Sequence, residues 1–294
     1  MANLRTMTWP QNKLKRLSRF LLFTNKSRAE VLHLMAVLAD LILYRQNFGK
    51  FPAPKILFRA LPFLIGRRRL GKVLTKAQFV HLHSIDEFNF TKADFHWIGN
   101  NAIFIPNGVP KSRRNVPVPF PKRGKEILVV GRIEPRKRQL EIAMAARDLD
   151  LPVTFVGSQS PTQRRYMEAF LAQVGESKTI KYLGPLSHID TVREMGNHRV
   201  LLSASLAEVL SLVELEAASA QCFLVTCGAG STRRYVSPDQ FFLYPVSEIQ
   251  TGLLLADTLR RSNLPASPST ELISWSEAAD KFKEYYMYKN VELS

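Results

Sequence analysis

The acidic residues of segment 203–220 are the side chains whose types and spacing best suit chemistry in this sequence. Ser211 and Glu214 have the spacing of a capping box, which predicts that a helix begins at this point. Glu208 then lies in the loop before the helix, and Glu216 lies about one turn inside it. A helix N-terminus offers unpaired N–H groups and a positive dipole end to an anion. Two carboxylates beside it could accept hydrogen bonds from sugar hydroxyls, although ordinary surface acids have the same spacing.

The sequence around this loop alternates between buried-strand patterns and helical patterns, and these elements must position it. Strands are predicted at 127–130, 153–156, 180–183, 199–202 and 223–226, and helices at 140–146, 162–174, 187–195 and 212–220, with a further helix after the turn at 228–230. Strands that alternate with helices at this spacing indicate an α/β fold with a doubly wound parallel sheet. Such a sheet binds ligands at the carboxyl ends of its strands.

The part of the chain before residue 125 carries a second, shorter set of elements. A strand is predicted at 79–84, a helix at 85–98 and a strand at 102–105. The turn signal Pro106-Asn-Gly108 follows, and the proline-rich segment 110–124 is typical of a linker between two domains. His81 and His83 share one strand face and could form a metal site or an active-site pair. Because no carboxylates stand at ligand spacing beside them, ordinary structural histidines are favoured.

The composition is that of a globular protein with one strongly basic end. Of the 294 residues, 46% are hydrophobic and 22% are charged. Segment 1–76 has 16 basic and 2 acidic side chains, so it holds +14 of the net charge of +16. Its apolar run 31–44 is short and contains His33 and Asp40, which argues against a membrane-spanning helix. The only two cysteines suggest no disulfide framework, which favours a reducing compartment.

The basic segment leaves several interpretations open. Basic helices with leucine and phenylalanine faces suit an anionic membrane surface. The same faces could instead pack into the protein beneath a solvated basic exterior. Nucleic-acid binding is a third option, but no recognised motif accompanies the charge. The stretch Gly66 to Lys72 nearly matches a phosphate-binding P-loop and is rejected, because Val73 replaces the residue that would hold magnesium.

The stretch Gly131-Arg-Ile-Glu-Pro-Arg-Lys137 carries a family resemblance. Together with Ile105-Pro-Asn-Gly108 and the pair Glu208 and Glu216, it resembles the retaining GT-B glycosyltransferases of glycosyltransferase family 4. The order and spacing of these motifs match the family. Further matches over about residues 105–290 are a turn at 228–230, a short apolar strand at 241–245 and, after Ser274-Trp275, a closing helix at 276–286 that crosses back to the first domain.

This resemblance implies a role for each matching residue. Arg132 and Lys137 would stabilise the donor diphosphate, and Glu208 would contact the hydroxyls of the donor sugar. Arg132, Lys137 and Glu208 are therefore the expected catalytic residues. The expected donor-binding residues are Gly131, Arg132, Lys137, Leu183, Gly184, Glu208, Ser211, Leu212, Val213 and Glu216, with the base at 182–186, the distal phosphate at the helix start and the ribose on Glu216. No metal and no cofactor are expected beyond the nucleotide-diphosphate sugar.

The expected architecture is GT-B-like, with a Rossmann-type second domain and a reduced α/β first domain. The first domain is expected at 1–109, the linker at 110–124, the donor domain at 125–273 and the closing helix at 274–294. The family's early strands and glycine-rich acceptor loop have no counterpart in residues 1–50, so the acceptor side is shortened or replaced.

The expected function is a retaining glycosyltransferase that acts on an unidentified acceptor, in the cytoplasm and peripherally at an anionic membrane through residues 1–76. The alternative is a non-catalytic glycosyltransferase-like subunit that binds a nucleotide sugar or docks a partner enzyme. A nucleic-acid partner is not expected.

Overall fold

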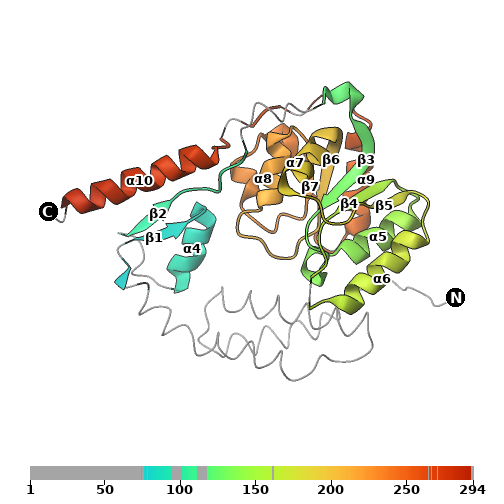
Figure 1. Ribbon diagram of the computed structural model, residues 1–294, viewed down its shortest axis with the longest axis horizontal. Helices are drawn as coiled ribbons and strands as arrows, with labels where there is room; N and C mark the ends of the chain where they lie inside the picture. Colours follow the sequence, from blue (N-terminus) through green and yellow to red (C-terminus); the bar gives the residue numbers. More distant parts are fainter. Residues whose placement is uncertain are drawn as a thin grey trace, which may run out of the picture.

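The chain folds into a large α/β unit and a small one. The computed structural model describes residues 74, 76–77, 79–94, 101–110, 118–160, 162–263, 265, 267–269 and 271–292 (Figure 1). The basic segment 1–76 therefore lies outside the described residues except at Leu74 and Lys76, as does the rejected P-loop match.

The large unit is built on a six-stranded parallel sheet with the strand order β5-β4-β3-β6-β7-β8. Its strands are β3 (Gly124–Val130), β4 (Val153–Val156), β5 (Ile180–Tyr182), β6 (His198–Ser203), β7 (Phe223–Thr226) and β8 (Phe241–Leu243). Its helices are α5 (Gln139–Asp148), α6 (Arg164–Gly175), α7 (His188–Asn197), α8 (Leu212–Ser219) and α9 (Ile249–Arg260). The predicted doubly wound α/β fold is confirmed.

Both faces of this sheet are covered by helices, because alternate residues of each strand point to opposite sides. Ile127 and Val129 of β3 pack in the core formed with α5, α6 and α9. Leu128, which lies between them, packs in the core formed with α7 and α8. Figure 1 shows the two helical layers on either side of the strands. A strand buried on both faces appears in the sequence as a continuous apolar run, and this is the pattern that predicted β3.

The strand order places a topological switch point between β3 and β6. From β3 the chain builds β4 and β5 on one side, then crosses back and adds β6, β7 and β8 on the other. The loops that follow β3 and β6 therefore leave the same edge of the sheet in opposite directions. Doubly wound sheets open a ligand crevice at this position.

A close backbone approach fixes the loop after β3. Gly131 N donates to Val156 O at 2.9 Å, and Gly157 N donates to Gly184 O at 3.0 Å, so the ends of β3, β4 and β5 are tied together. Gly157 has φ of +155°, and a Cβ built on it would lie 1.9 Å from Gly131 O. Only a glycine fits there, because any side chain would push the loop after β3 away from the sheet.

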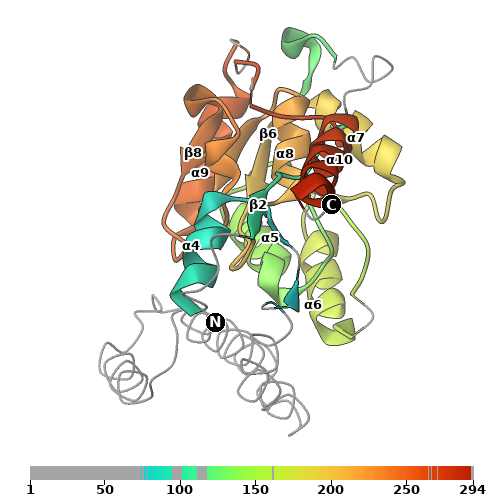
Figure 2. The same cartoon turned by 90° about the vertical axis from the view of Figure 1, so that its left-hand side faces the viewer.

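The small unit contains a two-stranded parallel sheet and a helix. It consists of β1 (Val80–Leu82), β2 (Ala102–Phe104) and α4 (Ile85–Asp94). The last helix, α10 (Trp275–Glu292), packs on this sheet: Ala278 and Phe282 lie against Ile103 and Ile105. Figure 2 shows α10 alongside β2. The predicted closing helix that crosses back to the first unit is therefore present, and it is longer than the predicted 276–286.

Polar contacts also join the two units beside β7. Ser84 and Ser231 share a buried hydroxyl–hydroxyl hydrogen bond of 2.9 Å. Arg234 donates to both carboxylate oxygens of Asp86 at 2.6 Å, and this bidentate pair, with Ser231, holds the pKa of Asp86 below its usual value although partial burial opposes the shift.

Three predictions about elements need correction or completion. The helix expected after 228–230 is wrong, because the segment makes only two 3₁₀ turns, Thr232–Arg234 and Pro238–Gln240. Pro238, which opens the second turn, prevents a helix from running continuously through this segment. The helix expected at 85–98 is observed as Ile85–Asp94, and residues 95–98 lie outside the described residues. Helix α9 was not predicted.

Replacement of Gly157 by alanine is expected to destabilise the protein by about 3 kcal/mol, because the new methyl group would collide with the carbonyl of Gly131. Urea unfolding of the purified variant measures this change. Gly175→Ala is the matched control, since a Cβ at Gly175 meets nothing within 4 Å; its free energy of unfolding should change by less than about 1 kcal/mol. Equal stability of the two variants would contradict the role given to Gly157.

Candidate functional site

Two loops of opposite charge meet at the switch point of the large sheet. The loop after β3 carries Arg132, Arg136 and Lys137 and includes a 3₁₀ turn, Pro135–Lys137. The loop after β6 carries Glu208 and ends at the first residue of α8. A backbone hydrogen bond from Leu206 N to Arg136 O at 2.9 Å joins the two loops directly. The fold therefore brings together residues that lie about seventy positions apart in the sequence.

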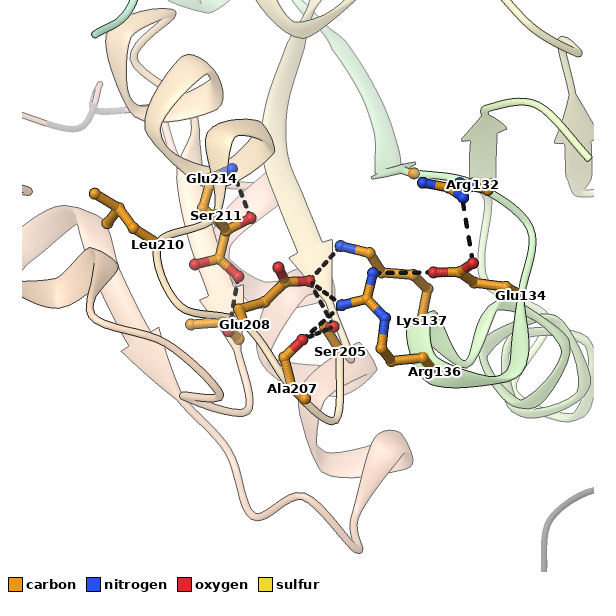
Figure 3. Close-up of polar contacts among 12 residues, drawn as sticks. Arg132, Glu134, Arg136, Lys137, Ser205, Ala207, Glu208, Leu210, Ser211 and Glu214 are labelled. Atoms are coloured by element: carbon orange, nitrogen blue, oxygen red, sulfur yellow. Dashed lines mark hydrogen bonds and ion pairs between the residues drawn. The ribbon is translucent and has the colours of Figure 1, made fainter. Parts of the chain in front are cut away.

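Glu208 is the centre of this contact (Figure 3). Its Oε1 forms an ion pair with Lys137 Nζ, accepts a hydrogen bond from Ser205 Oγ at 2.7 Å and pairs with Arg136 Nη1 at 3.1 Å. Burial of the carboxyl would raise its pKa, but the bonds from Lys137 and Ser205 and the charge of Arg136 outweigh it and lower the pKa of Glu208. Glu208 is thus held ionised at neutral pH, with both of its cationic partners on the opposite loop.

Arg136 is a site residue that the sequence reasoning missed. Its Nη1 donates to Ala207 O at 2.6 Å, and its Nη2 pairs with Glu134 at 2.9 Å. The guanidinium therefore bridges a carboxylate of its own loop and the backbone of the facing loop. The sequence could have indicated Arg136 by its position next to Lys137, because adjacent residues of a tight turn can both face one site.

Arg132 lies in the same loop but turns toward solvent. Its side chain is 58% exposed, and its Nε lies 3.9 Å from Glu134. The buried Gln139 fixes the backbone beneath it, because Gln139 Nε2 donates to Arg132 O at 2.8 Å and Gln139 Oε1 accepts from Glu134 N at 3.3 Å. Arg132 therefore has a rigid base and a mostly exposed guanidinium that forms only a loose ion pair with Glu134.

Helix α8 begins where the sequence predicted. Ser211 is its N-cap, and Ser211 Oγ accepts from Glu214 N at 3.4 Å. The Glu214 carboxylate does not complete a capping box; it is buried and accepts from Thr226 Oγ1 at 3.2 Å. Burial raises the pKa of Glu214, although its hydroxyl partners oppose the shift. The N–H groups of Leu212 and Val213 precede the first backbone bond of the helix, from Leu215 N to Ser211 O, and remain available to an anion.

Glu216 lies one turn further along α8 and does not contact Glu208. Its side chain is 8% exposed, and its Oε1 is 2.7 Å from His188 Nε2 at the start of α7. Leu183 and Gly184 were expected beside the nucleotide base. Leu183 follows β5 directly and is 44% exposed, and the carbonyl of Gly184 accepts a hydrogen bond from Gly157 N. The two predicted carboxylates therefore occupy separate parts of the same sheet edge.

The predicted histidine pair is not part of this site. His81 Nε2 bonds Ile105 O at 2.7 Å, and the His81 ring stacks edge-on against His83 and Phe282 with centroid distances of 4.6 Å. Both histidines thus belong to the packing of α10 on the small sheet. Within the described ranges, no group of three or more His, Cys, Asp or Glu side chains is arranged to hold a metal ion.

The fold is that of the GT-B glycosyltransferases. The chain belongs to the family of glycosyl transferases group 1, whose model matches residues 112–267. This range includes both loops and the start of α8 described above, from Arg132 to Glu216.

Solved structures with the same fold share little sequence with this chain. Sucrose-phosphate synthase from Thermosynechococcus elongatus is 17% identical, with a TM-score of 0.60 over 77% of this chain and 62% of that one. The α,α-trehalose-phosphate synthase (UDP-forming) from Burkholderia xenovorans is 15% identical, with a TM-score of 0.57 over 79% and 65%. A glycosyltransferase from Rickettsia africae is 12% identical, with a TM-score of 0.59 over 76% and 66%. The comparison with curated proteins gave no match.

These structural similarities establish the fold, and the match to the family model establishes the family. The chain spans about two thirds or less of the length of each of these three structures. The similarity therefore covers only part of each of these proteins. At such low identity it does not indicate the substrate of this chain.

The lowered pKa of Glu208 gives a pH-dependent contribution to stability. A carboxyl whose folded pKa lies below its unfolded value of about 4.3 stabilises the fold above that value and loses the effect as the pH falls through the folded pKa. Glu208→Gln should therefore lower the free energy of unfolding at pH 7 by about 1–2 kcal/mol, and the difference from the wild type should shrink below about pH 4.

Urea unfolding at pH 7, 5, 4 and 3 measures this difference. The control is Glu168→Gln, which removes an exposed i,i+4 ion pair with Arg164 on α6 and should change stability by less than about 0.5 kcal/mol at each pH. A difference for Glu208→Gln that grows as the pH falls would refute the assignment.

Proposed function

We propose that this protein is a retaining glycosyltransferase that transfers a sugar from a nucleotide-diphosphate sugar to an acceptor not yet identified. The observation that carries the proposal is the contact of Lys137 and Arg136 with Glu208 across the switch point, beside the N-terminus of α8. A diphosphate needs cations and N–H donors on one side, and a sugar needs a carboxylate near them. Membership of the glycosyltransferase family supports the reaction class.

The donor would bind by exchanging partners at Glu208. As the glycosidic bond breaks, negative charge develops on the leaving diphosphate, and Lys137 with Arg132 would neutralise it. The N–H groups of Leu212 and Val213 would hold the distal phosphate at the positive end of α8. When Lys137 turns to the phosphate, Glu208 gains an acceptor lone pair for a sugar hydroxyl, and Arg136 keeps its carboxylate in place. In this view Arg136 is a positioning residue and Lys137 touches the reacting diphosphate.

The domain roles follow from the same proposal. Residues 125–273 would bind the donor, residues 1–109 would form the acceptor side, residues 110–124 would link them, and residues 274–294 would tie the second domain to the first. Helix α10 and its packing on the small sheet support the last assignment. Leu183 and Gly184 are proposed to lie beside the base, and Glu216 to hold the ribose.

Lys137→Ala is expected to weaken binding of the nucleoside diphosphate product at least tenfold and to lower the rate of transfer or donor hydrolysis at least a hundredfold, because it removes the cation nearest the developing charge. Calorimetry with UDP, GDP and ADP, followed by a hydrolysis assay over the matching nucleotide sugars, measures both effects. Lys283→Ala is the control, since Lys283 is an exposed residue of α10 that pairs only within its own helix with Asp280.

The result of this assay separates the two functional interpretations. The proposal fails if no nucleotide or nucleotide sugar binds, or if Lys137→Ala binds like the wild type. Tight, Lys137-dependent binding without turnover, together with turnover once a fuller glycosyltransferase is added, would instead show the non-catalytic subunit. In that case the donor site stands and the acceptor side is supplied by the partner.

We further propose that the protein acts in the cytoplasm and contacts an anionic membrane through residues 1–76, on the strength of their charge of +14 alone. No helix among the described residues has the length and apolarity to cross a membrane. Flotation with vesicles that contain about 30% phosphatidylserine should recover the full chain and lose it in 0.5 M salt. Equal recovery on neutral vesicles, or recovery unchanged after removal of residues 1–50, would refute the membrane contact.

A further inference from the structure

His188 is the first residue of α7, and it reaches across to α8. Ser187 caps α7 by accepting from Asp190 N, which fixes the backbone of His188. The imidazole Nε2 then lies 2.7 Å from Glu216 Oε1. The His188 side chain is 59% exposed whereas that of Glu216 is 8% exposed, so the pair has one end in solvent and one end inside the protein.

The chemistry of the pair fixes the direction of this hydrogen bond. An ionised carboxylate only accepts hydrogen bonds, so His188 Nε2 must carry the proton whether the ring is neutral or charged. The bond occupies one oxygen of Glu216 and limits rotation about its terminal torsion, which is otherwise broad. The second oxygen and the remaining lone pair of the first are left to accept hydrogen bonds in a fixed plane.

The position of the pair places it inside the proposed donor site. Helix α7 follows β5 and helix α8 follows β6, so the N-termini of both helices open at the carboxyl edge of the sheet. The short segment between β5 and α7 contains Leu183 and Gly184, which are proposed to lie beside the base. His188 therefore links the segment proposed for the base to the carboxylate proposed for the ribose.

We propose that His188 is a positioning residue that holds the Glu216 carboxylate so that it accepts both hydroxyls of a ribose cis-diol. The recognised class is a ribonucleoside diphosphate, and a nucleotide without the 2′- and 3′-hydroxyls loses the contact. The inference rests on the proposed function, because it assigns a part of the same donor site. In a purely structural role, the hydrogen bond between His188 and Glu216 would only join α7 to α8, and its loss would affect all nucleotides equally, with or without ribose hydroxyls.

The test compares a ribonucleotide with its 2′,3′-dideoxy analogue by calorimetry. The probe is whichever of UDP, GDP and ADP binds the wild type most tightly. His188→Ala should weaken binding of the ribonucleotide about tenfold and leave binding of the dideoxy analogue within about twofold of the wild type. His188→Gln, whose amide N–H can replace Nε2–H, should restore ribonucleotide binding to within about threefold.

Two further variants complete the design. The double variant His188→Ala with Glu216→Gln should bind the ribonucleotide no more weakly than Glu216→Gln alone, because the histidine acts through the carboxylate. Arg193→Ala removes an exposed ion pair with Asp190 on the same helix and should leave both affinities unchanged. Thermal unfolding of each variant checks that the helices remain in place.

The outcomes separate this inference from the proposed function. An equal loss for the ribonucleotide and its dideoxy analogue in His188→Ala, or no loss for either, overturns the role of His188. Equal binding of the two nucleotides by the wild type also overturns it, while the proposed function stands. If none of the three diphosphates binds the wild type, the proposed function fails, and the assignment of His188 fails with it.

Discussion

The central position of β3 is the constraint on which the rest of the structure depends. This strand is paired on both edges, with β4 and β6, and packed on both faces. Because the chain reverses its direction of growth at β3, the loops after β3 and β6 both leave the carboxyl edge of the sheet at the switch point, where they contact each other. The close approach of Gly157 to Gly131 holds the loop after β3 against the sheet, so the position of this loop is fixed.

The charged side chains of the loops after β3 and β6 do not cancel one another. In the contacts of Figure 3, Arg132, Arg136 and Lys137 have two carboxylate partners, Glu134 and Glu208. The loops therefore carry an excess of positive charge beside the positive end of α8. A half-buried ion pair costs desolvation energy, and that cost is offset here by hydrogen bonds from both loops. Under the proposed function, a bound diphosphate would take the place of Glu208 as the partner of Lys137.

Local patterns were enough to predict the sheet but not the contacts between its loops. Apolar runs placed strands β3 to β7 to within three residues of their observed ends, because a parallel strand is buried on both faces, whereas β8 was expected only from the family resemblance. Helix α9 was missed although one of its faces is apolar, and in the structure no side-chain hydrogen bond caps its start. The segment of the turn Thr232–Arg234 was mistaken for a helix because composition does not show that the hydroxyl of Ser231 and the guanidinium of Arg234 bond the neighbouring unit. Sequence patterns describe segments, and these errors concern relations between segments.

The polar site illustrates the same limit. Lys137 and Glu208 are separated by 71 residues, so no periodicity could predict their contact, and only the family resemblance placed both in one site. Arg123 and Arg199 would be taken for solvated charges, yet both are buried, lie over Phe120 and donate to backbone carbonyls. An arginine can satisfy its donors on carbonyls alone, which no pattern of charge reveals.

The segment after β7 connects the crevice to the small unit. A Cβ on Gly230 would lie 3.0 Å from the Cβ of Glu208, and Ser231 N donates to Val209 O at 3.0 Å. The segment after β7 therefore packs against the loop that carries Glu208. Ser231 Oγ bonds Ser84 of the small unit on its other side. Two adjacent residues thus touch Glu208's loop and the first domain at once. Displacement of the small unit would therefore have to break the hydrogen bond between Ser84 and Ser231 or move the segment that contacts the loop of Glu208.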